Sequence, residues 1–254
     1  MRSAVSRAAL VAALAVGGGV GGGDPAGAQT AGSSCRDSPH VAPGDERYIC
    51  ALYVDLLQRD RVPSDAELAG WTAQLATSSR ATVTRALAYS DENLRGLVRG
   101  AYRDLLFRSA DPGGLAHWVD QLRRGTPLER VEAAIVSGAE GFRVQAGSDA
   151  GTFVDALYAL YLDRVPTDAE VDGWTAHLAA QGGGAAAREQ MTLAIASSPE
   201  GRRVTTETLF DYWLPRLADP GGRTYWSEQL RIRGFLAVEA DFVAEDEVYR
   251  ALER

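Results

Sequence analysis

The sequence contains no lysine, and only three histidines and two cysteines among its 254 residues. All 26 basic side chains are arginines, and 34 acidic residues outnumber them, which gives a net charge of −8. Nucleic acids and anionic membranes are bound by basic surfaces, so this balance argues against both as partners. His40, His117 and His177 are far apart in the sequence and no Cys/His cluster occurs, so no metal site is expected.

Long apolar runs are also missing. The apolar stretch Ala8–Val16 is about nine residues long, whereas about 20 are needed to cross a bilayer. It follows a short basic segment and precedes Ala26-Gly27-Ala28, a small-residue pattern typical of signal cleavage. We therefore predict that residues 1–28 are a signal peptide and that the protein is secreted, with no transmembrane segment after cleavage. The remaining chain has 24 arginines and 33 acidic residues, a net charge of −9.

Export predicts the state of the two cysteines, because secreted proteins fold in an oxidising compartment. A disulfide between Cys35 and Cys50 would attach a leader, residues 29–47, to the start of the first helix. The alternative, a reactive or metal-binding pair, has no neighbouring His or Cys partner.

The mature chain lacks the common catalytic motifs. It has no G-x-S-x-G turn and no phosphate-binding glycine loop, and Gly182-Gly183-Gly184 is interpreted as a flexible connector. We predict no catalytic residues and no cofactor. An acidic pair acting on an extracellular polymer is the enzymatic alternative.

The dominant feature of the sequence is an internal repeat. Residues 61–76 and 164–179 are identical at 12 of 16 positions, and residues 108–123 and 216–231 at 10 of 16. The offsets of 103 and 108 residues indicate a duplicated unit of about 105 residues. Four tryptophans mark four repeats at spacings of 47, 56 and 52 residues: Trp71, Trp118, Trp174 and Trp226.

Apolar spacing predicts three short helices in each repeat and no strands, so the expected fold is all-α. We divide the mature chain into a first repeat pair, residues 48–146, and a second, residues 147–254. The first helix of each repeat ends near an arginine that suits the helix dipole: Arg59, Arg108, Arg164 and Arg216. The third helices supply core residues: Val83 and Leu87, Val131 and Ile135, Met191 and Ile195, Val238 and Phe242.

The acidic loops before the Trp helices are interpreted as helix caps rather than active-site loops. Two have capping boxes, Ser64–Glu67 and Thr167–Glu170, and two have an Asp-Pro start, at Asp111 and Asp219. The junctions predict a further capping box at 137–140 and a Ser cap at Ser198. Calcium binding is the alternative, although no loop has the dense Asp/Asn ladder of an EF-hand.

The first three repeat tryptophans lie in line with leucines and are expected in the core. The fourth repeat differs, because Arg223 stands three residues before its tryptophan and Pro215 should end its first helix early. The candidate ligand-binding residues are therefore an exposed aromatic patch of this repeat, made of Trp213, Tyr225 and Trp226.

A longer pattern joins these features: Tyr-x5-Arg, then Asp-Pro-Gly-Gly-x3-Trp-x3-Leu. The second repeat matches this pattern at the most positions: Tyr102, Arg108, Asp111-Pro112-Gly113, Trp118, Leu122 and Ser137. This pattern resembles the bacterial domain of unknown function 4214, whose helical fold is similar to the phycobilisome linker domain. The resemblance covers nearly the whole mature chain, in two tandem copies, although repeats one and three have Pro-Ser/Thr-Asp in place of Asp-Pro. It implies an exported or cell-surface protein without established catalytic residues, and it does not imply pigment binding.

These observations favour a secreted, non-enzymatic interaction or scaffold module that binds an extracellular protein or a cell-envelope component. A carbohydrate-binding module that uses the aromatic residues of the fourth repeat is the first alternative. An extracellular hydrolase is the second.

Overall fold

The computed structural model describes residues 33–214 and 216–253, and in these ranges the chain is helical with no strand. The predicted signal peptide, residues 1–28, and Pro215 lie outside the described residues. In chain order the elements are α2 (Ser33–Arg36), α3 (Asp45–Ala51), the π-helical η2 (Leu52–Leu56), α4 (Asp65–Leu75), α5 (Arg80–Ala88), α6 (Asp91–Leu106), α7 (Pro112–Arg123), α8 (Leu128–Ser137), α9 (Ala139–Ala146), α10 (Ala150–Leu162), α11 (Asp168–Ala180), α12 (Ala185–Ala196), α13 (Pro199–Trp213), α14 (Pro220–Arg233), α15 (Phe235–Ala244) and α16 (Asp246–Leu252).

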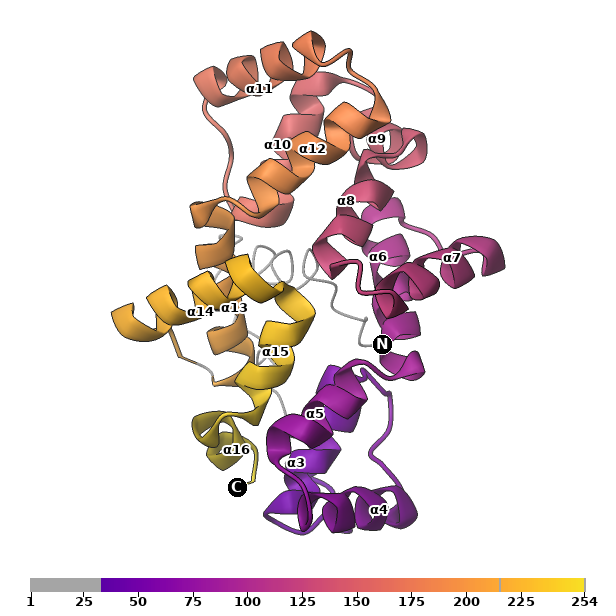
Figure 1. Ribbon diagram of the computed structural model, residues 1–254, viewed down its shortest axis with the longest axis vertical. Coiled ribbons are helices and arrows are strands. Elements are labelled where there is room, and N and C mark those ends of the chain that lie inside the picture. Colours follow the sequence, from indigo (N-terminus) through magenta and orange to yellow (C-terminus); the bar gives the residue numbers. More distant parts are fainter. Residues whose placement is uncertain (1–32, 215, 254) are drawn as a thin grey trace, which may run out of the picture.

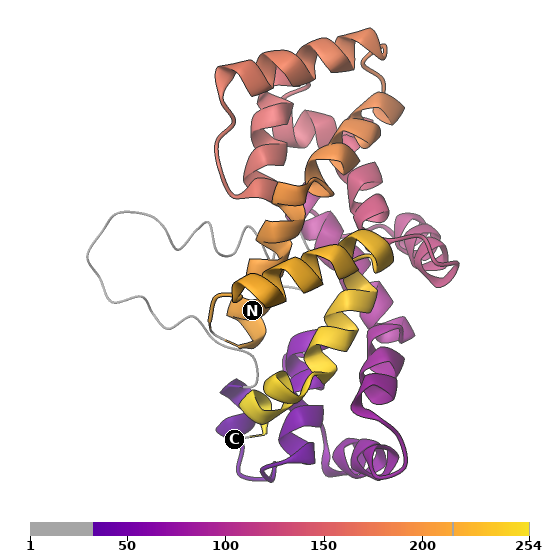
Figure 2. The ribbon, with the colours of Figure 1, turned by 60° about the vertical axis from the view of Figure 1, so that its left-hand side comes forward.

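The Trp helices α4, α7, α11 and α14 lie at the periphery (Figure 1). Helices α11 and α4 occupy opposite ends of the long axis (Figure 2). The short helices α9 and α16, which follow α8 and α15, were not expected from the sequence. At the other two junctions the chain runs directly into the long helices α6 and α13.

The capping predictions are confirmed in all four loops before the Trp helices. Both capping boxes are formed, and Asp111 and Asp219 accept hydrogen bonds from backbone amides in the first turns of α7 and α14. Ser198 also caps α13 as expected. The predicted capping box at 137–140 is wrong, because Gly138 is the N-cap of α9 and makes no side-chain cap bond. The hydroxyl of Ser137 lies instead 2.9 Å from that of Thr192, inside the molecule.

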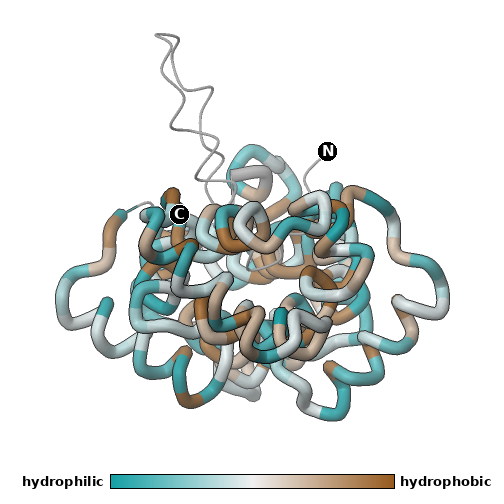
Figure 3. Tube along the Cα trace, turned by 90° about the horizontal axis from the view of Figure 1, so that it is seen from above, coloured by the Kyte–Doolittle hydropathy of each residue, from teal (hydrophilic) through white to brown (hydrophobic). Residues whose placement is uncertain are grey.

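The predicted third-helix residues are buried, and they form one continuous core with the first helices. Trp71, Trp118 and Trp174 pack against the edge of this core and stay partly exposed. Hydrophobic residues concentrate along the inner helices, whereas the outer arms are mostly polar or neutral (Figure 3). Within residues 33–214 and 216–253, no helix combines the length and apolarity that a membrane span needs.

Two helix pairs join the halves of the chain: α5 packs against α15, and α8 packs against α12. Each pair has the same arginine contact. Arg80 Nε donates to the carbonyl of Ala244 at 3.2 Å, and Arg188 Nε donates to that of Ser137 at 2.9 Å. The guanidinium carbons lie 4.5 Å above the ring of Tyr249 and 4.2 Å above that of Phe142, respectively. The contact is therefore duplicated across the molecule, and each copy holds the end of a third helix.

We expect Arg188→Met to lower the free energy of unfolding by about 2 kcal/mol, since an unpaired buried acceptor costs about 1–3 kcal/mol. Methionine keeps the apolar stem but leaves the carbonyls of Ser137 and Gly183 without their donor. Urea titration at pH 7 measures the loss. Arg80→Met is the matched control and should cost less than about 1 kcal/mol, because the Arg80 side chain is 31% exposed and its bond to Ala244 is longer. Equal losses at both positions would contradict this prediction.

The two ends of the described chain meet. The amide of Gly44 donates to the carbonyl of Glu253 at 3.1 Å, and the rings of Tyr48 on α3 and Tyr249 on α16 lie 5.3 Å apart. The consecutive helices α9 and α10 have a similar aromatic contact, with the rings of Phe142 and Phe153 5.2 Å apart. Helix α16 thus packs on α3 much as α9 packs on α10, although α16 and α3 come from opposite ends of the sequence.

The predicted disulfide is present between Cys35 on α2 and Cys50 on α3. Both cysteines are fully buried, and Val41 of the intervening segment is buried as well. The described part of the leader, residues 33–47, is therefore attached to α3 through Cys35 and Cys50.

Candidate functional site

A polar cluster with the same parts occurs once in each repeat. At its centre is the arginine that follows the first helix, and its guanidinium lies over an aromatic ring six residues earlier in the chain. The distances from guanidinium carbon to ring centroid are 4.4 Å for Arg59 on Tyr53, 5.0 Å for Arg108 on Tyr102, 4.8 Å for Arg164 on Tyr158 and 4.8 Å for Arg216 on Phe210.

Each of these arginines also binds a glutamate in the first turn of a later helix. Arg108 is representative, since its Nε and Nη2 donate to the two carboxylate oxygens of Glu140 at 2.6 and 2.8 Å. Such two-point pairing fixes both position and orientation. The other pairs are Arg59 with Glu92, Arg164 with Glu200 and Arg216 with Glu247. Every repeat is thereby fastened to the helix that follows it.

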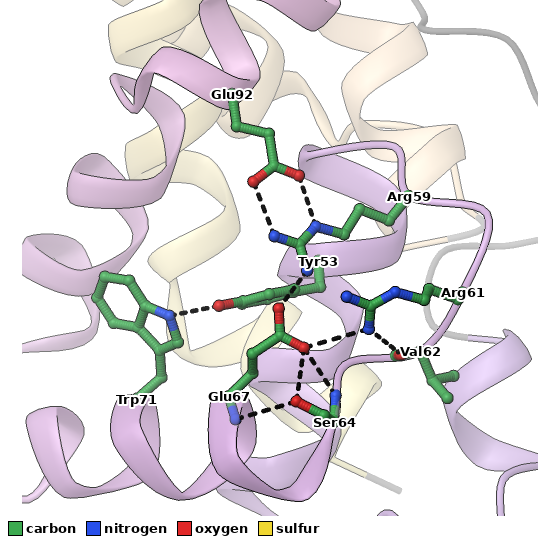
Figure 4. Close-up of polar contacts among 8 residues, drawn as sticks. All are labelled: Tyr53, Arg59, Arg61, Val62, Ser64, Glu67, Trp71 and Glu92. Carbon is green, nitrogen blue, oxygen red and sulfur yellow. Dashed lines mark hydrogen bonds and ion pairs between the residues drawn. The ribbon is translucent and has the colours of Figure 1, made fainter.

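The clusters of the first and third repeats contain a second glutamate, the one in the capping box. In the first repeat Glu67 accepts from the Ser64 amide, from Arg59 at 2.5 Å and from Arg61 at 3.2 Å, while Trp71 Nε1 donates to the Tyr53 hydroxyl at 2.6 Å (Figure 4). In the third repeat a single arginine, Arg164, donates to both carboxylate oxygens of Glu170 and to the carbonyl of Val165. In the first repeat the corresponding contacts are divided between Arg59 and Arg61. Trp71 lies 18 residues after Tyr53, whereas Trp174 lies 16 residues after Tyr158, so repeat one accommodates two extra residues without loss of the cluster.

The second and fourth repeats use glycine where the others use this glutamate. A Cβ atom at Gly114 would overlap the Tyr102 hydroxyl, and one at Gly222 would press on the ring of Phe210. The aromatic ring can therefore approach the start of the Trp helix only because these positions have no side chain. The Asp-Pro-Gly-Gly sequence and the capping box are two solutions to the same packing problem.

The electrostatics of the clusters are those of stable ion pairs. The bond from Arg164, with that from the Thr167 amide, lowers the pKa of Glu170 to about 2. The Ser64 amide and Arg59 hold the pKa of Glu67 well below its usual range, and each partner arginine lowers the pKa of Glu92, Glu140 and Glu200. These carboxylates are charged and engaged at neutral pH, so their contribution to stability is lost only as the pH falls below about 4.5.

The structure does not bring Trp213, Tyr225 and Trp226 into one exposed patch, so the expected arrangement is wrong. Trp213 is 1% exposed and belongs to the core, because the inner face of α13 packs against α15. Trp226 is 7% exposed and lies edge-on to Phe242, with ring centroids 5.1 Å apart. Only Tyr225, at 54% exposed, reaches the surface, and its ring stands nearly perpendicular to that of Trp226.

Two hollows adjoin Tyr225. One, of about 380 Å³, lies where α5 of the first repeat meets α14, α15 and the start of α16. The other, of about 240 Å³, lies between α13, α14 and α16. Both are lined by Tyr225, Trp226 and Glu245, so these three residues separate the hollows.

A partly buried acid lies beside Trp213. On α15, Glu239 is next to Trp213, and burial raises its pKa from 4.5 to about 7. The folded state therefore favours the protonated carboxyl, and this group destabilises the protein as the pH rises from about 4.5 through 7.

Glu239→Gln should remove this pH dependence. We expect the variant to gain about 2 kcal/mol relative to the natural protein between pH 5 and pH 8, as measured by urea unfolding at each pH. Asp172→Asn, on the exposed face of α11, is the control and should leave the pH profile unchanged. Parallel profiles for Glu239→Gln and the natural protein would contradict the prediction.

Within the described parts of the chain, no group of three or more His, Cys, Asp or Glu residues is placed to hold a metal ion. The arginine–glutamate pairs were missed by sequence reasoning because the partners are 31 to 36 residues apart. The recurrence of a glutamate at that distance after each arginine was the available signal.

Comparison with known proteins matches one segment of the chain to a family model. Residues 133–204 match the family model described as a domain of unknown function (DUF4214). The match begins within α8, ends within α13 and crosses the predicted division at residues 146 and 147. This segment thus has the family resemblance expected from the repeat motif. No curated protein and no solved structure shows a significant match to the chain.

Proposed function

We propose that the protein is a secreted, non-enzymatic interaction module that binds an extracellular protein or a cell-envelope component. One observation carries this proposal: the side chains repeated in all four repeats are used in internal contacts. The arginines, glutamates and aromatic rings of the clusters fasten successive helices, and the loop acids cap them. Residues that differ between the repeats are then the ones available for binding. The signal-like N-terminus and the buried disulfide support secretion.

The architecture that we propose is a duplicated pair of modules with a fold like that of the phycobilisome linker domain, of which one is contiguous and one is split. The contiguous module is the matched segment, from α8 to the start of α13. The split module consists of α15 and α16 followed by α3, η2, α4, α5 and the start of α6. The duplicated arginine contacts and the pairing of α16 with α3 support this assignment.

A circular permutant tests the split module. It joins Glu253 to Ser33 through a Gly/Ser linker and opens the chain at Gly125, in the loop between α7 and α8, so that both modules become contiguous. We expect a folded, helical protein that retains the Cys35–Cys50 bond and unfolds in one transition. A permutant that stays unfolded with every linker length would contradict the assignment.

The binding function is tested with the mature protein, residues 29–254, immobilised and incubated with secreted proteins and with purified cell-envelope fractions. The proposal expects specific retention of one component that resists washing at physiological salt. Recovery of nothing above the level of an unrelated acidic helical protein would overturn it.

Carbohydrate binding is the second candidate, and the half-exposed ring of Tyr225 between two hollows favours it. In the described residues no comparable observation favours the hydrolase alternative, because the capping acids Glu67, Asp111, Glu170 and Asp219 already accept bonds from backbone amides.

A further inference from the structure

The hollow between the first and fourth repeats has an internal counterpart with which it can be compared. Duplication relates α14–α16 to α7–α9 at an offset of 107 to 108 residues, since Glu247 and Tyr249 take the places of Glu140 and Phe142. The counterpart of the 380 Å³ hollow therefore lies between α7, α8, α9 and α12. A residue that is needed only to hold the fold together should have a chemically similar residue at the corresponding position of the counterpart.

The charged residues of the hollow are absent from its counterpart. Arg85, Tyr225, Asp241, Glu245 and Asp246 correspond in sequence to Leu193, His117, Ala134, Gly138 and Ala139. Four of these lining positions thus differ in the same direction, from small or apolar to charged, and at the fifth a phenol ring replaces an imidazole. Because the counterpart packs without these groups, the architecture does not require them.

The hollow combines an aromatic surface, the ring of Tyr225, with hydrogen-bonding side chains around it. Trp226 is wedged between Tyr225 and Phe242, with ring centroids 5.0 and 5.1 Å away, and so holds the Tyr225 ring in place. Arg85 donates to Asp241 at 2.8 Å and is about half exposed, so it is oriented but still reachable by solvent.

Glu245 supplies a free acceptor at the edge of both hollows. It is exposed, and it makes no side-chain cap bond at the start of α16. No other described side chain pairs with its carboxylate, whereas Asp241 and Asp246 are held by arginines.

We propose that this hollow binds a pyranose sugar of an uncharged or amino-bearing glycan, with Tyr225 as the stacking platform and Glu245 and Arg85 as hydrogen-bonding partners. The apolar face of a sugar ring packs on an aromatic side chain, and its hydroxyls need acceptors and donors at the rim. Three carboxylates and one arginine line the hollow of a chain with net charge −8, which disfavours anionic sugars. This proposal rests on the proposed function, because it names the chemistry of the envelope component.

The test uses the mature protein with three hexasaccharide probes: a neutral glucan, a glucosamine oligomer and a uronic-acid oligomer. Isothermal titration calorimetry should show binding of the neutral or the amino probe and not of the uronate. Tyr225→Ala should weaken binding at least about tenfold, as expected for a central aromatic contact. Glu245→Gln should weaken binding severalfold, and His117→Ala, at the counterpart position, should leave it unchanged.

The site is overturned if neither the neutral nor the amino probe binds, if the uronate binds best, or if Tyr225→Ala binds as well as the natural protein. A second experiment distinguishes failure of the sugar site from failure of the proposed function. In it the natural protein and Tyr225→Ala are each incubated with the envelope fractions. Equal retention of both proteins overturns the sugar site and leaves the interaction function standing. Retention of neither, with the envelope fractions and with the secreted proteins alike, overturns both.

Discussion

Trp213→Ala should lower the free energy of unfolding by about 3–5 kcal/mol, the cost of removing a buried aromatic side chain from a packed core. Trp213 is 1% exposed, and it is among the largest fully buried side chains of the described chain. Its loss leaves a cavity between α13 and α15, two helices that pack against each other. Urea titration followed by circular dichroism at 222 nm measures the effect.

Tyr225→Ala is the matched comparison, because both residues were expected from the sequence to share one exposed patch. The Tyr225 side chain is 54% exposed, so its removal should cost less than about 1 kcal/mol. Trp213→Phe, which keeps most of the ring volume, should recover a large part of the lost stability. Similar losses for Trp213→Ala and Tyr225→Ala would contradict the different burial of the two residues.

The double substitution Cys35→Ser and Cys50→Ser should cost about 3 kcal/mol. The bond closes a loop of 15 residues, and the chain-entropy model assigns this stabilisation to the restricted unfolded state. The buried leader residue Val41 should also become more mobile, since α2 is then held to α3 by packing alone. Limited proteolysis should therefore cut the leader of the variant before it cuts the helices.

Reduction of the natural protein is the control for this experiment. It should lower the urea midpoint by the same amount as the double substitution, whereas the reductant should not affect the variant. An unchanged midpoint in both cases would show that the leader contributes nothing to the stability of the fold.

Much of the local structure was predictable because its signals lie within a few residues of each other. The Ser64–Glu67 and Thr167–Glu170 boxes each join positions three apart, and Asp111 and Asp219 cap the turn that directly follows them. The disulfide also joins cysteines only 15 residues apart. The one failed cap, at 137–140, shows the limit of such signals. There the Ser137 hydroxyl contacts that of Thr192 inside the molecule, and the Glu140 carboxylate pairs with Arg108, so neither side chain caps the helix.

The candidate site depended on contacts that no local pattern contains. Arg223, three residues before Trp226, suggested an exposed tryptophan, but that arginine turns away to bind Glu207 on α13. The ring of Phe242 on α15 then covers Trp226. The hollow beside Tyr225 exists only because α5 packs on α15, and these helices are more than 140 residues apart in the sequence.

By itself, then, the sequence determined the helical class, the internal repeat, the caps and the disulfide, because each arises from periodicity or from residues close together in the chain. The tertiary structure alone decided that the two ends of the chain pack together, that each repeat arginine pairs with a distant glutamate, and that Trp226 supports Tyr225 from beneath. Burial and pairing depend on neighbours brought together by packing, and a side chain that is exposed on its own helix is covered as soon as another helix lies across it.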